Sequence, residues 1–171
     1  MDSTHEFTIR KATPEDADAI VALSVAAFEG ETVDFFLQGR FGPRSAPLRG
    51  KTWEERHAET IRKHVSQSLE QVFVAEVEGR LAGYMTYRLD PEASTGTVSY
   101  NAVHPDYQGR GIATGLIARV LNTFRQQGLR YARVTTLETD IRARGLYEKA
   151  GFTELVKLID YVQELRAKES Q

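Results

Sequence analysis

The residues whose types and spacing are best suited to binding or chemistry lie in the stretch "VHPDYQGRGIATGL", residues 103–116. A strand pattern precedes this stretch and an amphipathic helix pattern follows it, so Gly109 and Gly111 fall where a helix begins. Glycine in a first helical turn costs about 1 kcal/mol of stability relative to alanine, so a compensating advantage is expected. Backbone N–H groups at a helix start are unpaired and partly positive, and glycines leave them accessible. The stretch predicts a cradle for a phosphate or pyrophosphate, with Gln108 and Arg110 as donors at its rim.

These glycines also fit a purely structural role, and two nucleotide-binding motifs have similar glycines. A tight strand-to-helix turn can use glycine for its backbone angles alone, and this alternative stays open. A P-loop requires lysine and then serine or threonine after its last glycine, whereas Ile112 follows Gly111 here. A dinucleotide-binding fingerprint requires a third glycine at its sixth position, which is Thr114 when counted from Gly109. The two nucleotide-binding motifs are therefore poor matches.

Composition limits the classes of function. The chain has 171 residues, 41% of them hydrophobic and 27% charged, with a net charge of −2, which predicts one domain, 1–171, and no nucleic-acid surface. It has no cysteine, so disulfides and thiolate nucleophiles are excluded. The four histidines are not spaced as metal ligands, and no metal site is predicted. No signal peptide is recognised and no apolar run reaches the ~20 residues of a membrane span, so a cytoplasmic protein without a membrane partner is expected.

The pattern of apolar residues predicts which elements position the glycine stretch. Thr52 followed by Glu55 is a capping box at the start of one of the helices. The predicted order is strand 7–13, helix 13–28, loop 29–51 with room for one helical turn, helix 51–70, hairpin 71–90, strand 95–104, helix 112–127, strand 129–138, helix 139–151 and closing strand 152–165. This order is typical of a mixed α/β domain.

Two separate motifs carry a resemblance to a known family. Gln108, Gly111 and Ala113 match the pattern Q/R-x-x-G-x-G/A within "AVHPDYQGRGIATGLI", and "ARGLYEKAGF" (143–152) is similar to a later family segment. The chain resembles the GNAT superfamily of acetyl-CoA-dependent N-acetyltransferases over about residues 7–163. The loop from Glu29 to Lys51 has no clear counterpart. The resemblance implies a mixed, mostly antiparallel central sheet flanked by helices.

The resemblance also implies that an acetyl group is transferred from acetyl-CoA, the cosubstrate, to a primary amine of a small molecule or peptide. The amine would attack the thioester directly in a ternary complex, and no metal would be needed. A homodimer is compatible with the family. The cofactor-binding residues that it implies are Ala102, Val103, Gln108, Gly109, Arg110, Gly111, Ile112, Ala113, Thr114, Asp140 and Tyr147.

The resemblance assigns roles to three of these residues. A main-chain N–H near Val103 would stabilise the oxyanion, and the Tyr147 phenol would give the departing thiolate its proton. Tyr147 also fits a second description, a partly buried aromatic residue on the core face of a helix. Asp140 stands where relatives commonly have an asparagine that contacts the cofactor arm, and an ionised aspartate offers no amide donor. Capping of the following helix is its expected main role.

The general base is undecided at this point. The strand before the glycine stretch carries Ser99, Tyr100 and Asn101, where many relatives have a carboxylate. An amine with a pKa near ~10.4 has to lose a proton before it attacks a thioester. The candidates are a water chain that ends at Tyr100 or Ser99, or one of the carboxylates of Glu29, Glu31, Glu76 and Glu138.

Two other classes of function compete with the enzyme. The missing carboxylate fits a non-catalytic acyl-CoA-binding or regulatory module with the same fold, and the glycines alone would fit a nucleotide-binding protein. The acceptor is not encoded in any motif. The basic half of loop 29–51, with Arg40, Arg44 and Arg49, is expected either to orient an anionic acceptor or to be a solvated surface.

Overall fold

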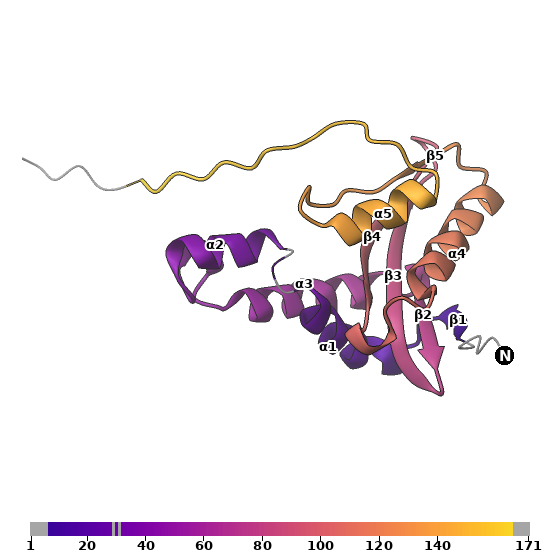
Figure 1. Cartoon of the computed structure of the whole chain (residues 1–171), viewed down its shortest axis with the longest axis horizontal. Helices are drawn as coiled ribbons and strands as arrows, with labels where there is room; N and C mark the ends of the chain where they lie inside the picture. Colours follow the sequence, from indigo (N-terminus) through magenta and orange to yellow (C-terminus); the bar gives the residue numbers. More distant parts are fainter. Residues whose placement is uncertain (1–6, 29, 31, 166–171) are drawn as a thin grey trace, which may run out of the picture.

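The computed structural model describes residues 7–28, 30 and 32–165. Its centre is a five-stranded sheet in the order β1-β2-β3-β4-β5 (Figure 1). The strands are β1 (Thr8–Lys11), β2 (Val72–Val77), β3 (Arg80–Asp90), β4 (Thr95–Val103) and β5 (Tyr131–Arg133). The first four pair antiparallel, and β5 pairs parallel to β4. The predicted mixed, mostly antiparallel sheet is confirmed.

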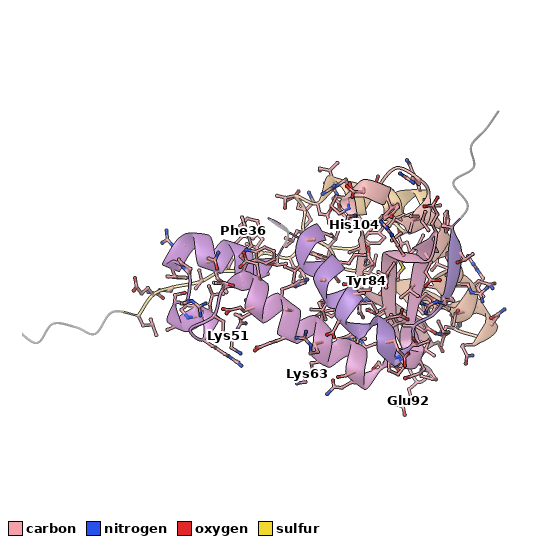
Figure 2. The ribbon with its side chains drawn as sticks, turned by 90° about the horizontal axis from the view of Figure 1, so that it is seen from below. Phe36, Lys51, Lys63, Tyr84, Glu92 and His104 are labelled. Carbon is pink, nitrogen blue, oxygen red and sulfur yellow. The ribbon has the colours of Figure 1, made fainter. Side chains whose placement is uncertain are left out.

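Helices cover both faces of this sheet. They are α1 (Ala17–Ala27), α2 (Val33–Phe41), α3 (Trp53–Gln67), α4 (Ile112–Gln126) and α5 (Ile141–Lys149). Helices α1 and α3 pack on one face, which contains Val72, Val74 and Tyr84, and Figure 2 shows Tyr84 beside them. Helix α4 packs on the other face, against Phe73 and Ala75. The alternation along β2 therefore divides the core into two layers.

The predicted capping box begins α3 as expected. Thr52 Oγ1 accepts a hydrogen bond from Glu55 N (3.3 Å), and Glu55 Oε2 accepts one from Thr52 N (2.7 Å). Ile61 and Val65 follow on the buried face of the helix. Local sequence thus determines where this helix starts and which face it buries.

The prediction of a loop over 29–51 is wrong for most of its length. Helix α2 occupies nine of these residues, and a short 3₁₀ turn follows at Ala46–Leu48. Contacts with α3 hold α2 in place: Trp53 N donates to Gln38 Oε1 (2.9 Å), and Arg56 pairs with Asp34 (3.0 Å). The glycines in this stretch lower its helix propensity, so the sequence did not indicate a helix that tertiary contacts stabilise.

The last two predicted strands are also wrong in extent. Strand β5 covers 131–133 rather than 129–138, and no strand is assigned between 152 and 165. That segment is an extended chain that leads away from the sheet (Figure 1). Its alternating apolar residues favour a strand, but a strand needs a neighbour to pair with. Within the described chain, this segment has none.

A glycine in β4 provides a test of the packing of α4. A Cβ on Gly96 would lie 2.5 Å from ring carbons of Phe124, which is itself 3% exposed. We expect Gly96→Ala to lower the free energy of unfolding by about 1–3 kcal/mol in urea titrations, because the ring has to move. Gly39→Ala, in α2, is the control: its Cβ meets nothing within 4 Å, and helix propensity favours alanine. Equal stability of Gly96→Ala and wild type would contradict this packing.

Candidate active site at the fork between β4 and β5

The strands β4 and β5 separate after a short stretch of pairing. Their register runs from Thr95 opposite Tyr131 to Thr97 opposite Arg133, where β5 ends. Strand β4 continues to Val103, paired only with β3 on its other side. Beyond Thr97 the space between the two chains forms a fork. A cavity of about 360 Å³ lies there, lined by residues 97–100 on β4 and by Thr135.

The main chain of β4 presents donors to this fork. Tyr100 N donates to Thr86 Oγ1 (2.8 Å), and His104 N donates to Ala82 O (2.8 Å), so these two groups face β3. Successive N–H groups of a strand point to opposite sides. The N–H groups of Asn101 and Val103 therefore face the fork, where β5 no longer pairs with them. A strand edge of this kind can donate hydrogen bonds to a carbonyl oxygen.

The predicted catalytic tyrosine lies at the same fork. Asn101 Nδ2, on β4, donates to the phenol oxygen of Tyr147, on α5 (2.9 Å). Tyr147 is 6% exposed and belongs to the core cluster under α4, so it is a core aromatic residue whose hydroxyl reaches β4. Burial raises the pKa of the Tyr147 phenol, and the hydrogen bond from Asn101 opposes this shift. The phenol is consequently protonated at neutral pH and able to donate.

Asn101 was not predicted as the partner of Tyr147. The sequence feature that could have indicated its role is its position on the strand before the glycine stretch, where the family resemblance leads one to expect a carboxylate. The two residues are 46 positions apart, and only the fold brings them together.

The glycine stretch forms a turn that ends at the first residue of α4. Gly109 and Gly111 have φ angles of +76° and +80°, a conformation that side chains disfavour. The turn thus requires glycine for its angles, as the tight-turn alternative states. A Cβ at either position would meet nothing within 4 Å, so the space outside the turn is open. The two roles of the glycines are compatible: the turn needs them, and they leave the helix start accessible.

The first turn of α4 exposes its N–H groups. Its first intrahelical bond runs from Gly115 N to Gly111 O (2.9 Å), which leaves the N–H groups of Ile112, Ala113 and Thr114 without intrahelical acceptors. The side chain of Ile112 is 1% exposed and lies in the core. Only its main chain can therefore meet a ligand, as expected for a site built from helix-start N–H groups.

Three side chains lie around this helix start, two from the glycine turn and one from α5. Gln108 Nε2 donates to Val103 O (3.4 Å), and Gln108 Oε1 accepts from Arg142 of α5 (2.9 Å). Arg110 donates to Asp106 O (3.2 Å). Arg142 adds a second guanidinium that sequence reasoning missed, because it lies on a distant helix. The arrangement brings two cations to a helix start whose unpaired N–H groups favour an anion.

Two of the predicted cofactor-binding residues, Asp140 and Ala102, have side chains with structural roles. Asp140 is the N-cap of α5, and its Oδ1 accepts from Ala143 N (2.9 Å). The expected capping role is confirmed. The side chain of Ala102 is 8% exposed and packs in the layer of α1 and α3, away from Tyr147. Ala102 can therefore contribute only its main chain to a site at the fork.

The two candidate carboxylate bases within the described residues, Glu76 and Glu138, do not line the cavity at the fork. Glu76 Oε1 accepts from Arg10 (2.6 Å) on the far strands β1 and β2. Glu138 is exposed and forms an ion pair with Lys157, whose hydrogen bond lowers the Glu138 pKa. Glu29 and Glu31 lie outside the described residues. Instead, His64 of α3 packs against Tyr100, with ring centroids 5.0 Å apart.

Two kinds of feature are absent from the described part of the chain. No group of three or more histidine, aspartate or glutamate side chains is arranged as metal ligands in it. In the same residues, no helix has the length and apolarity to cross a membrane.

Sequence comparison identifies relatives of the whole site region. The model of the acetyltransferase (GNAT) family matches residues 35–152, which includes most of α2 and therefore part of the segment for which no counterpart was expected. An acetyltransferase of Yersinia pestis (strain Pestoides F) is 30% identical over 102 residues, 60% of this chain and 70% of that protein. A mycothiol acetyltransferase of Beutenbergia cavernae is 33% identical over 84 residues, 49% of this chain and 28% of that protein.

Structure comparison gives the same fold in proteins of low identity. A PaiA N-acetyltransferase from Thermoplasma acidophilum, in complex with coenzyme A, has a TM-score of 0.62 at 18% identity, covering 86% of this chain and 90% of its own. An N-acetylglutamate synthase from Neisseria gonorrhoeae, with coenzyme A and N-acetyl-glutamate, has a TM-score of 0.60 at 21% identity, covering 84% of this chain and 28% of its own.

Proposed function

We propose that this chain, which belongs to the acetyltransferase (GNAT) family, transfers an acetyl group from acetyl-CoA to a primary amine by direct attack in a ternary complex. The observation that carries the proposal is the pairing of Asn101 with the Tyr147 phenol at the fork. This pairing supports the proposal because a protonated phenol meets the strand whose N–H groups at Asn101 and Val103 lack a partner on the β5 side. Acyl transfer from a thioester to an amine needs both kinds of group.

The glycine turn and the start of α4 fit the pyrophosphate of acetyl-CoA. The N–H groups of Ile112, Ala113 and Thr114 would donate to it, and Gln108, Arg110 and Arg142 would surround it. The main chain at Ala102 and Val103 would hold the pantetheine arm along β4. Bound there, acetyl-CoA supplies an acyl group activated as a thioester.

The residues at the fork would then act on the acyl group in order. The main-chain N–H of Val103, which faces the fork, would donate to the oxygen that becomes negative when the amine attacks. Tyr147 would protonate the sulfur as the C–S bond breaks, and Asn101 would keep its hydroxyl aimed at β4. Because burial raises the Tyr147 pKa, the phenol stays protonated until the thiolate forms.

The main competing function is a non-catalytic acyl-CoA-binding module. The absence of a carboxylate at Ser99, Tyr100 and Asn101 favours it. A panel of amines separates the two: amino acids, polyamines, aminoglycosides and peptides with free N-termini, each incubated with acetyl-CoA while thiol release is measured. We expect acetylated product from at least one amine. Tight coenzyme A binding with no transfer to any amine would favour the module.

The pyrophosphate site can be tested by charge alone. Gly111→Asp and Gly111→Asn have side chains of nearly equal size and suffer the same positive φ, but only aspartate is negative. We expect Gly111→Asp to bind coenzyme A at least tenfold more weakly than Gly111→Asn in calorimetry, because the charge would lie against the pyrophosphate. Equal affinities for the two variants would mean that the phosphates bind elsewhere.

Tyr147→Phe removes the proposed acid and keeps the ring. We expect kcat to fall by about 100-fold or more, the range typical of a general acid, while the Kd for coenzyme A changes little. Tyr131→Phe is the control, because Tyr131 is 57% exposed on β5. A Tyr147→Phe enzyme with unchanged kcat, under conditions where chemistry limits the rate, would leave Tyr147 as a packing residue only.

A further inference from the structure

The cavity at the fork has a polar wall that is not part of the proposed acetyl-CoA site. Besides residues 97–100 of β4 and Thr135, it is lined by His64 of α3 and Arg88 of β3. Its lining residues His64, on α3, and Tyr100, which packs against the core of the α1 and α3 layer, lie on that side of the sheet, whereas Tyr147 packs in the layer of α4. A donor bound along α4 and α5 and an acceptor in this cavity would therefore approach β4 from opposite layers.

His64 is the titratable side chain of this wall that is best placed for proton transfer. Its ring packs edge-on against Tyr100, with centroids 5.0 Å apart at 74°. Its Nε2 is buried and lacks a hydrogen-bond partner within the described residues. Along α3, His64 is partly buried and stands between Lys63, which Figure 2 shows on the outer side of the helix, and the buried Val65. A buried nitrogen without a partner is a position at which a ligand's polar group gains free energy.

The surroundings of His64 favour its neutral form. Burial lowers the pKa of the imidazole, and the nearby guanidinium of Arg88 lowers it further. Arg88 on β3 and Tyr100 on β4 are the titratable groups that face it from the strands. A neutral imidazole has one nitrogen free to accept a proton.

We propose that this cavity receives the acceptor amine and that His64 takes the proton which the ammonium form has to lose before attack. The inference rests on the proposed acetyl transfer and names its missing base. It also removes the need for a carboxylate on β4, since the base comes from α3.

The protons balance in this scheme. The ammonium gives one proton to His64, which releases it to solvent. The neutral nitrogen then forms the C–N bond to the acetyl carbon, and the C–S bond breaks. The second proton leaves the nitrogen for solvent, while Tyr147 protonates the thiolate and recovers its proton from solvent. One amide, one thiol and one net proton result.

The test compares two histidines of the same helix. His64→Gln removes the base, whereas His57→Gln, two turns earlier, changes a histidine that is bonded to Ser24 Oγ (2.8 Å) and does not line the cavity. With the best amine of the panel, we expect kcat/KM of His64→Gln to fall by about 100-fold at pH 7. The Kd for coenzyme A should not change, and His57→Gln, if it is folded by thermal melting, should keep the wild-type rate.

The pH profile and chemical rescue distinguish a base from a structural residue. Because the neutral form is active, the wild-type kcat/KM should fall as the pH drops through the lowered imidazole pKa, below the ordinary ~6.5. His64→Gln should lose this limb, and added imidazole should partly restore His64→Ala. A folded His64→Gln with the wild-type rate and profile would overturn the assignment of the base and leave acetyl transfer intact. A wild-type enzyme that acetylates no amine would overturn both.

Discussion

The early separation of β4 from β5 is the constraint on which the other features of the site depend. Parallel pairing stops at Thr97, so the N–H groups of Asn101 and Val103 face the fork while β3 holds the other edge of the strand. Unpaired main-chain donors are costly unless something binds them, and a thioester carbonyl is a suitable acceptor. The same separation leaves room for the cavity beside His64 and lets the hydroxyl of Tyr147 reach Asn101. The groups proposed to act in catalysis, from β4, α3 and α5, thus lie around the fork because one strand pair is short.

The sheet that carries the fork is packed on both faces. Tyr84, fully buried on β3, shares a hydrogen bond with Ser24 of α1 (2.8 Å), which joins that helix to the sheet. On the other layer, Phe124 lies against Gly96 at the point where β4 still pairs with β5. A site held between two packed layers can keep its donors in place without reorganisation during the reaction.

Local signals in the sequence predicted the features that local interactions determine. The capping box at Thr52 and the glycines that begin α4 are decided within a few residues, and both were predicted. Helix α2 was missed because contacts such as Gln38 with Trp53 stabilise it from another helix. Asn101 and His64 were missed as partners of the site for the same reason, since each meets residues far along the chain. The segment 152–165 shows the opposite error: its alternating apolar residues favour a strand, but a strand forms only beside a pairing neighbour, and none lies next to it within the described residues.

The central claim is direct attack of an amine on the thioester while both substrates are bound. Initial rates measured over a matrix of acetyl-CoA and amine concentrations test it most directly, together with the intact mass of the protein after incubation with acetyl-CoA alone. Direct attack predicts double-reciprocal lines that intersect and a protein mass that does not change. Parallel lines, together with an acetylated protein that then passes its acetyl group to the amine, would contradict the account.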